Sequence, residues 1–504
     1  MSALIISDLP VPQSTIQTQQ IPFASALYVL AALITVIAGA MLLPAFAAIS
    51  RNEPDIAAAF AGSALGGAFF GGGLMLALQG TQKPAPMREN IGLIIFAWIV
   101  LSLFAAIPLL ASGASRSVVD AIFESASALT TTGASLLGAP ETQSPAILLW
   151  LAELQWFGGY ASIAMAATVL SALGTAGLDV QRTLLPLGQS GAVFERFFHI
   201  AGSLAFVYIA ATLIGFIAIW AGGVPRFDAF CLALSGIATG GLKLNSLGFE
   251  AYHAPVAEIA LVVLMFFGAM NFVSHWAALR SGSARGIVRT YGNDPEFWLL
   301  LIGCGLATLL LTSAGATRQM NQASFTVFNA VSLVTTSGFW DGPLIAPSPA
   351  AALGAILLVF IGGASVSTSG GLKLMRIWLL LAHARRELRR LVHPRSARTI
   401  RFRGRVLDDE VLRGMWAFFV GYVAIFAGVS AVLAALGLDL VQAMTAAVSA
   451  LANTGPLLTI VSGGGEPYVL LPDTAKWLLS AVMIIGRLEV LAFLSVLHPA
   501  FWRG

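Results

Sequence analysis

Four short segments of this chain align without a gap on a serine and on a glycine six positions later. They read Ser127-Ala-Leu-Thr-Thr-Thr-Gly133, Ser235-Gly-Ile-Ala-Thr-Gly-Gly241, Ser332-Leu-Val-Thr-Thr-Ser-Gly338 and Ser449-Ala-Leu-Ala-Asn-Thr-Gly455. Each is small and polar, and each lies between long apolar runs. Non-helical backbone at membrane depth is tolerated only where it is buried in protein or lines a water-filled cavity. Because rings of backbone carbonyls from such turns can replace the hydration shell of a potassium ion, the pattern indicates one ion pore with four similar walls.

The composition places the chain in a membrane. Hydrophobic residues make up 58% of the sequence and charged residues 10%, whereas a soluble domain has roughly 25% charged residues. Apolar segments long enough to cross a bilayer, at about 20 residues each, recur along the whole length. The net charge of +3 is small and does not favour a nucleic-acid partner. The N-terminus lacks the features of a cleaved signal peptide.

Long apolar helices flank each polar turn, and the turns recur at a near-constant period of about 100 residues, which is typical of an internal repeat. We expect outer helices near 91–112 and 146–173, 197–222 and 253–280, 296–314 and 349–383, and 412–436 and 475–500. An accessory hairpin near 22–48 and 57–80 precedes them. The predicted fold is therefore an all-α polytopic membrane protein with four pseudo-symmetric helix–pore loop–helix repeats around one pore. The predicted units are residues 1–85 for the tail and hairpin, then repeats at 86–180, 181–290, 291–400 and 401–504.

A short helix leads into each turn, and its start can be read from the sequence. Asp120, Asp228 and Asp439 lie at or near three of these N-termini, and Asn321 lies near the fourth. Aspartate and asparagine are good N-caps. The C-terminal end of each short helix then points at the pore, where its partial negative charge favours a cation.

The distribution of lysine and arginine predicts the orientation. Segments that join one repeat to the next are rich in both residues, above all from Lys373 to Arg413. The loops on the side of the turns hold fewer, namely Arg51, Arg116, Arg226, Lys243, Arg318 and Lys476. Because cytoplasmic loops carry the excess of positive charge, we expect the joining segments in the cytoplasm and all four turns to open outward.

Two further features interrupt the apolar helices. The stretch from Gly362 to Gly371 is rich in glycine and serine where a helix is expected to cross, so it predicts a broken helix with a loop beneath the turns. Small-residue helix packing is the alternative. Arg487 lies in the middle of the last apolar segment, where an ionisable residue is costly and usually functional. A buried ion pair with Glu489 or Glu153 is the alternative there.

Several polar residues have structural explanations. Asn271 and His275 are four apart on one expected helical face, and we interpret them as interhelical hydrogen-bonding residues. The two cysteines, Cys231 and Cys304, have no metal-ligand spacing and are interpreted as packing residues. Lys243 directly follows the second turn and would repel cations unless it is turned away or paired, for instance with Glu250.

Over about residues 20–504 the chain resembles the membrane subunits of the Trk/Ktr/HKT superfamily of potassium transporters, most closely the bacterial Trk type. The matching stretches are the four turns together with Gly268-Ala-Met-Asn-Phe-Val-Ser-His275, Asp294-Pro-Glu-Phe297, Gly362-Gly-Ala-Ser-Val-Ser-Thr-Ser-Gly-Gly-Leu-Lys373 and Gly486-Arg-Leu-Glu489. The resemblance implies potassium uptake across the bacterial inner membrane by a homodimer with one pore per subunit. It also implies a cytosolic ring of nucleotide-binding regulatory subunits. This chain has no nucleotide-binding motif of its own.

The resemblance also implies roles for individual residues. The potassium-selectivity filter comprises Thr131, Thr132, Gly133, Thr239, Gly240, Gly241, Thr336, Ser337, Gly338, Asn453, Thr454 and Gly455. The gating elements are Gly362, Gly363, Gly370 and Gly371 of an intramembrane loop, together with Arg487 facing the pore below the filter. Potassium is the transported ion, and no cofactor is expected. In plant relatives, serine at the position of Gly133 goes with sodium transport, so glycine favours potassium.

Three alternatives remain at this point. A sodium-permeable relative with the same fold would show comparable sodium and potassium currents. A membrane enzyme is disfavoured because no histidine, cysteine and carboxylate cluster has metal spacing and no nucleophile–base pair stands out. A membrane sensor that kept the fold and lost transport is supported only by Lys243.

Overall fold

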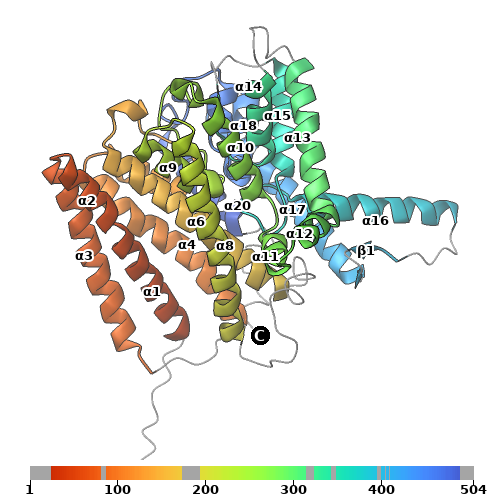
Figure 1. Cartoon of the computed structure of the whole chain (residues 1–504), viewed down its shortest axis with the longest axis horizontal. Helices are drawn as coiled ribbons and strands as arrows, with labels where there is room; N and C mark the ends of the chain where they lie inside the picture. The colour runs from red at the N-terminus through yellow and green to blue at the C-terminus, as the bar shows by residue number, and fades with distance from the viewer. Residues whose placement is uncertain are drawn as a thin grey trace, which may run out of the picture.

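The computed structural model describes residues 24–80, 87–172, 193–313, 323–341, 348–393, 399–402, 405–407 and 409–488. Helices dominate these ranges, and the all-α polytopic fold expected from the sequence is confirmed (Figure 1). Strands β1 (Arg401–Phe402) and β2 (Arg405–Val406) form a two-stranded antiparallel ribbon. Five of the described helical segments are long and apolar enough to cross a membrane, or six if one sharply bent pair counts as a span.

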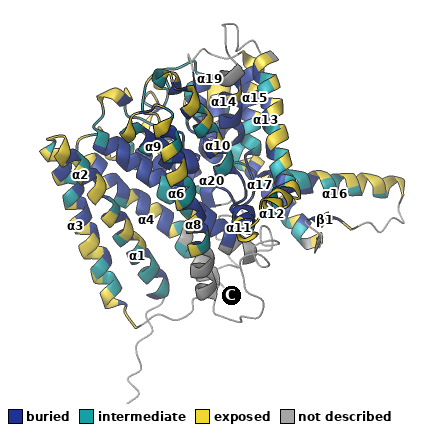
Figure 2. Ribbon diagram, in the orientation of Figure 1, coloured by how far each residue is buried: buried dark blue, intermediate teal, exposed yellow. Residues whose placement is uncertain are grey.

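The N-terminal hairpin lies at one side of the molecule (Figure 1). Its first arm comprises α1 (Ala24–Ala40) and α2 (Leu42–Ser50), and its second arm is α3 (Pro54–Ala77). The hairpin packs on α4 (Met87–Ala111) and α6 (Pro145–Ala172) of the first repeat. Its outward face exposes large apolar side chains such as Phe69 and Leu65, as expected for contact with lipid (Figure 2).

Each repeat contains an outer helix, a short helix, a polar turn and a second outer helix. The first repeat is α4, α5 (Val118–Leu129) and α6, and the second is α8 (Val193–Ala221), α9 (Arg226–Ile237), α10 (Pro255–Ala269) and α11 (Phe272–Arg280). After α12 (Ala284–Gly292), the third is α13 (Pro295–Ser313), α14 (Ala323–Val334), α15 (Pro349–Ile361) and α16 (Leu374–Val392). The fourth is α17 (Asp409–Ala435), α18 (Leu440–Leu451), α19 (Pro456–Val461) and α20 (Asp473–Leu488).

The short helices begin where the sequence predicted, although not always on the predicted cap. Asp439 caps α18 by accepting a hydrogen bond from Gln442 N at 2.8 Å. Ser117, not Asp120, caps α5, and Asp120 lies in its first turn. Asp228 likewise lies in the first turn of α9. Asn321 lies outside the described residues.

The expected continuous helix over 253–280 is wrong. It is broken at residues 270–271, where α10 and α11 meet at 99°. Asn271 does not share a helical face with His275, because it is the N-cap of α11 and accepts a hydrogen bond from Val273 N at 3.0 Å. The amide of Phe272 donates to Val366 O at 2.8 Å instead of continuing the ladder of α10. A contact nearly a hundred residues away therefore stabilises the break, which is why local sequence does not predict it.

The second expected break is present. Residues 362–373 form a non-helical loop between α15 and α16, and we call Gly362–Lys373 the gate loop after the role that the family resemblance implies. Beyond it α16 extends sideways from the helical body (Figure 1).

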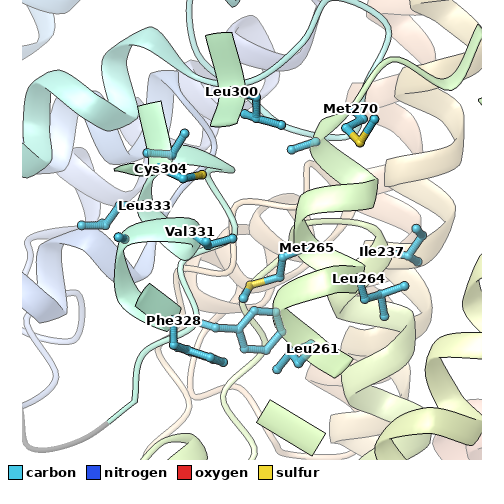
Figure 3. Close-up of a cluster of buried hydrophobic side chains, with 14 of the residues drawn as sticks. Ile237, Leu261, Leu264, Met265, Met270, Leu300, Cys304, Phe328, Val331 and Leu333 are labelled. Atoms are coloured by element: carbon cyan, nitrogen blue, oxygen red, sulfur yellow. The ribbon is translucent and has the colours of Figure 1, made fainter. Parts of the chain in front are cut away.

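Apolar packing between the repeats holds the short helices in place. Figure 3 shows Leu261 and Met265 of α10 beside Phe328 of α14, in a buried cluster that joins the second and third repeats. Cys304 of α13 lies in this cluster, and Cys231 of α9 lies in the cluster of the first repeat. Both cysteines are buried free thiols, consistent with a packing role.

Candidate functional site

The spacing between serine and glycine reflects one backbone hydrogen bond that all four turns share. In each turn the serine carbonyl accepts from the amide five residues later, at distances of 2.7, 2.9, 2.9 and 2.8 Å in chain order. The donors are the amides of Thr132, Gly240, Ser337 and Thr454. This bond closes the C-terminus of each short helix and starts the extended polar segment that follows it.

Left-handed backbone marks the same two positions in the first three turns. The residue two before the glycine has φ of 55°, 52° and 57° at Thr131, Thr239 and Thr336, and the glycines that follow have φ of 74°, 64° and 77°. Positive φ is unfavourable for a residue other than glycine. The surrounding structure therefore holds the threonines in this conformation.

The glycines close a ring of four turns. A Cβ atom added to Gly133 would collide with Gly240 O, and one added to Gly241 would collide with Ser337 O. One added to Gly338 would meet the Pro456 ring, and one added to Gly455 would collide with the backbone of Ala134. Each turn therefore abuts the next, and the fourth abuts the first. The twelve residues expected to form a filter therefore lie in four turns that contact one another.

Side chains and backbone also connect the turns directly. Gly455 N donates to Thr132 O at 2.6 Å, and Asn453 Nδ2 donates to Thr132 Oγ1 at 3.0 Å. Gln155 of α6 donates from Nε2 to Gly240 O at 3.1 Å, and Tyr468 donates to Gly455 O at 2.7 Å. These bonds restrict how far the ring can widen.

The fourth turn departs from the other three. Asn453 has φ of 52°, like the threonines, but Gly455 has φ of −55° and is the N-cap of α19. Pro456 follows at the first position of that helix, where its fixed φ suits a helix start. Glycine is therefore needed at position 455 for close approach to Ala134, not for its backbone angle.

A wide vestibule lies on one side of the ring. Its volume is about 530 Å³, and its lining includes Gly133, Gly241 and Gly338 of the turns. Lys243 also lines it, and the predicted pairing with Glu250 is not among the ion pairs of the described residues. Instead the Lys243 charge acts on Glu141. Although partial burial opposes the shift, hydrogen bonds from Ser246 together with Lys243 lower the pKa of Glu141.

On the other side of the ring lies a cavity of only about 30 Å³, next to the gate loop. Three cationic side chains line it: Lys373, Arg376 and Arg487. Arg376 stacks on the ring of Phe418 at 4.1 Å, and Lys373 donates from Nζ to Ser369 O within the gate loop. A cation that passes the ring meets concentrated positive charge and almost no free volume on this side.

Arg487 does not form the alternative ion pair with Glu153. The side chain is 5% exposed, and within the described residues its Nε and Nη2 have no hydrogen-bond partner. Glu153 Oε2 is also without a partner there. Glu489, the other predicted partner, lies outside the described residues.

The gate loop is hydrogen-bonded to the ring. Gly370 N donates to Thr336 Oγ1 at 2.7 Å. Thr368 Oγ1 donates to Ile237 O and to Gly268 O, each at 2.9 Å. An added Cβ on Gly370 would collide with Ala452 O beside the fourth turn. Of the predicted gating glycines, Gly370 therefore lies against the third turn and the residue before the fourth, while Thr368 of the same loop is bound to the second repeat.

Sequence reasoning missed two contacts that support the ring. Lys476 of α20 forms an ion pair with Asp120 of α5 at 2.6 Å, so the first and fourth repeats are joined by a largely buried ion pair. Gln155, which bonds Gly240 O, was also missed. A charge near the start of each helix was the available signal for the first pair, but nothing in the sequence indicates which two helices meet.

Comparisons with known proteins agree with this architecture. The family model described as TrkH, cation transport protein, matches residues 58–500. The Trk system potassium uptake protein TrkH of Vibrio parahaemolyticus is 35% identical over 434 residues, covering 83% of this chain and 86% of that protein. TrkI of Halomonas elongata is 34% identical over 485 residues, covering 95% and 97%. The crystal structure of the potassium transporter TrkH from V. parahaemolyticus superposes with a TM-score of 0.84 at 31% identity, covering 96% of this chain and 100% of that one.

Proposed function

Because this chain belongs to the TrkH family of cation transport proteins, we propose that it takes up potassium through the ring of four turns. The relatives named as potassium uptake proteins support the ion. The closed ring supports the route, because each turn abuts the next and the fourth abuts the first. This ring is the single observation that carries the proposal.

The turns act as the selectivity filter in this proposal. A potassium ion exchanges its water shell for backbone carbonyls of the four turns. The short helices α5, α9, α14 and α18 end at the turns, so the partial negative charge of their C-termini stabilises a dehydrated cation there. Hydrogen bonds between turns, such as Asn453 to Thr132, keep the ring at one width and so discriminate against ions of another size.

The gate loop and Arg487 control flux on the far side of the filter. The cavity there is nearly filled, and its cationic lining opposes a potassium ion electrostatically. Opening requires the gate loop to leave its contacts with the ring. Once the loop has moved, an inside-negative potential contributes about 2.3 kcal/mol per charge per 100 mV to inward movement.

The remaining parts of the proposal concern assembly and location. The excess of lysine and arginine between repeats supports a cytoplasmic location for those segments and a periplasmic location for the vestibule in a bacterial inner membrane. The chain acts as a homodimer, and cytosolic nucleotide-binding subunits set the state of the gate loop.

Growth of a bacterial strain that lacks its own potassium uptake systems tests the function. We expect this chain to restore growth at low potassium, and Gly133→Ser to weaken that rescue because its side chain would collide with Gly240 O. Gly39→Ala is the matched control, since an added Cβ there meets no atom within 4 Å. Sodium currents comparable to the potassium currents, or no rescue with the protein present in the membrane and its cytosolic partner supplied, would contradict selective potassium uptake.

A further inference from the structure

One buried carboxylate joins the two broken helices of this molecule. Glu296 Oε1 accepts hydrogen bonds from Ser365 N at 2.8 Å and from Ser365 Oγ at 2.5 Å, in the gate loop. Its Oε2 accepts from Asn271 Nδ2 at 3.2 Å, at the break between α10 and α11. Glu296 is 1% exposed, and both partner residues are buried. Each carboxylate oxygen therefore holds a different break.

Glu296 is itself placed by a neighbouring carboxylate. It lies in the first turn of α13, where its amide donates to Asp294 Oδ1 at 3.0 Å. Asp294 Oδ2 accepts from Ser274 Oγ of α11 at 2.6 Å. The start of α13, the start of α11 and the gate loop are thus connected through two acidic side chains.

When Glu296 is ionised, its contact with Ser365 is harder to break than the other contacts of this part of the loop. Hydrogen bonds to an ionised acceptor are roughly twice as strong as neutral ones. Separating a buried carboxylate from its hydrogen-bond donors also costs free energy, because water does not replace the donors. The neighbouring contacts, Ala364 N to Ala269 O and Phe272 N to Val366 O, join neutral backbone groups.

A surface helix is joined to the same residues. α12 has no buried residue and carries Arg285 and Arg289. Tyr291 of α12 hydrogen-bonds His275 of α11 at 2.8 Å, and that imidazole stacks on Phe267 at 3.6 Å between ring centres. Only two residues separate the end of α12 from the start of α13. A displacement of α12 therefore moves the segment that carries Asp294 and Glu296.

We propose that Glu296 is a positioning residue that latches the gate loop closed, and that movement of α12 withdraws its carboxylate from Ser365 and releases the loop. The inference rests on the proposed function, because a latch has meaning only if potassium passes through the ring and then past the gate loop. It adds to that function the residue that holds the closed state and the surface element through which a cytosolic partner acts.

Potassium influx into lipid vesicles that contain the purified chain alone tests the latch. We expect Ser365→Ala to raise this unstimulated influx about tenfold, since it removes one donor to an ionised acceptor. Glu296→Gln should raise it at least as much, because both oxygens then lose their charge. Ser430→Ala is the matched control: Ser430 is buried like Ser365, and its hydroxyl bonds only within α17, to Phe426 O at 2.8 Å.

Uptake by potassium-depleted cells that contain the native cytosolic partners completes the experiment. A purely structural role predicts lower influx in both assays together with a lower thermal unfolding temperature. A latch predicts raised influx in vesicles and nearly unchanged uptake in cells. Unchanged or reduced vesicle influx in both variants, with wild-type uptake intact in cells, would overturn the latch and leave potassium uptake standing. Loss of wild-type uptake itself would count against the proposed function instead.

Discussion

The spaces on the two sides of the ring differ in size and in charge. The vestibule has a volume of about 530 Å³, and its described lining includes the carboxylates of Glu124, Glu250 and Glu466 and the single cation Lys243. The cavity beside the gate loop has about 30 Å³, and three cations line it. A hydrated cation has room to arrive on the first side, and both volume and charge oppose it on the second. In the proposed function, this difference assigns selection and control to opposite faces of the same ring.

Disrupting the ring itself should have the largest effect on potassium uptake. We expect Gly241→Ala to reduce potassium-dependent growth to that of cells without the chain, because an added Cβ collides with Ser337 O and φ at this position is 64°. Gly72→Ala, at a helical glycine with no atom within 4 Å of an added Cβ, is the control. Normal growth with Gly241→Ala would mean that the ring is wider in the membrane than described here.

The buried ion pair between Lys476 and Asp120 supports the vestibule side of the ring. Lys476→Met leaves Asp120 without its cation at a site that is 15% exposed. Breaking a buried pair in this way costs about 3–5 kcal/mol, so we expect a clearly lower unfolding temperature in detergent. Arg51→Met, at an exposed loop position, is the control. An unchanged unfolding temperature would show that the pair is solvated.

Neutralising Arg487 should reduce the difference in charge between the two sides of the ring. The side chain is buried, and its Nε and Nη2 lack hydrogen-bond partners within the described residues. We therefore expect Arg487→Gln to keep the fold and to raise potassium influx about tenfold, since a unit charge within a few ångströms of the pathway contributes at least that much. Influx into vesicles at fixed membrane potential measures the effect. Reduced influx with normal expression would assign Arg487 a structural role.

The smallest expected effect concerns the vestibule charge. Glu141→Gln leaves Lys243 uncompensated near the mouth, which lowers the local concentration of cations. We expect the apparent KM for potassium to rise about two- to threefold at low ionic strength, with an unchanged maximal rate. Lys243→Gln in the same background should restore the KM. A KM insensitive to both changes would place Lys243 away from the path of entry.

Interactions between residues close in sequence explain which features of the fold could be predicted. The six-residue spacing of serine and glycine encodes a backbone bond inside each turn, so it predicts all four turns without knowledge of their neighbours. The gate loop is visible for the same reason, because the stretch from Gly362 to Gly371 resists helix formation by its own composition. The break at Met270–Asn271 has no such signal, since a hydrogen bond from Phe272 to the distant Val366 stabilises it.

The sequence by itself determined the class of protein, the number of repeats and the identity of the turns, because each depends on hydropathy or on contacts within about ten residues. Only the tertiary structure decided that the turns form a closed ring, that the fourth glycine serves close packing and not positive φ, and that Asp120 pairs with Lys476. It also decided that Glu296 holds both broken helices. These features depend on which helices become neighbours in space, which is set by the packing of the whole chain.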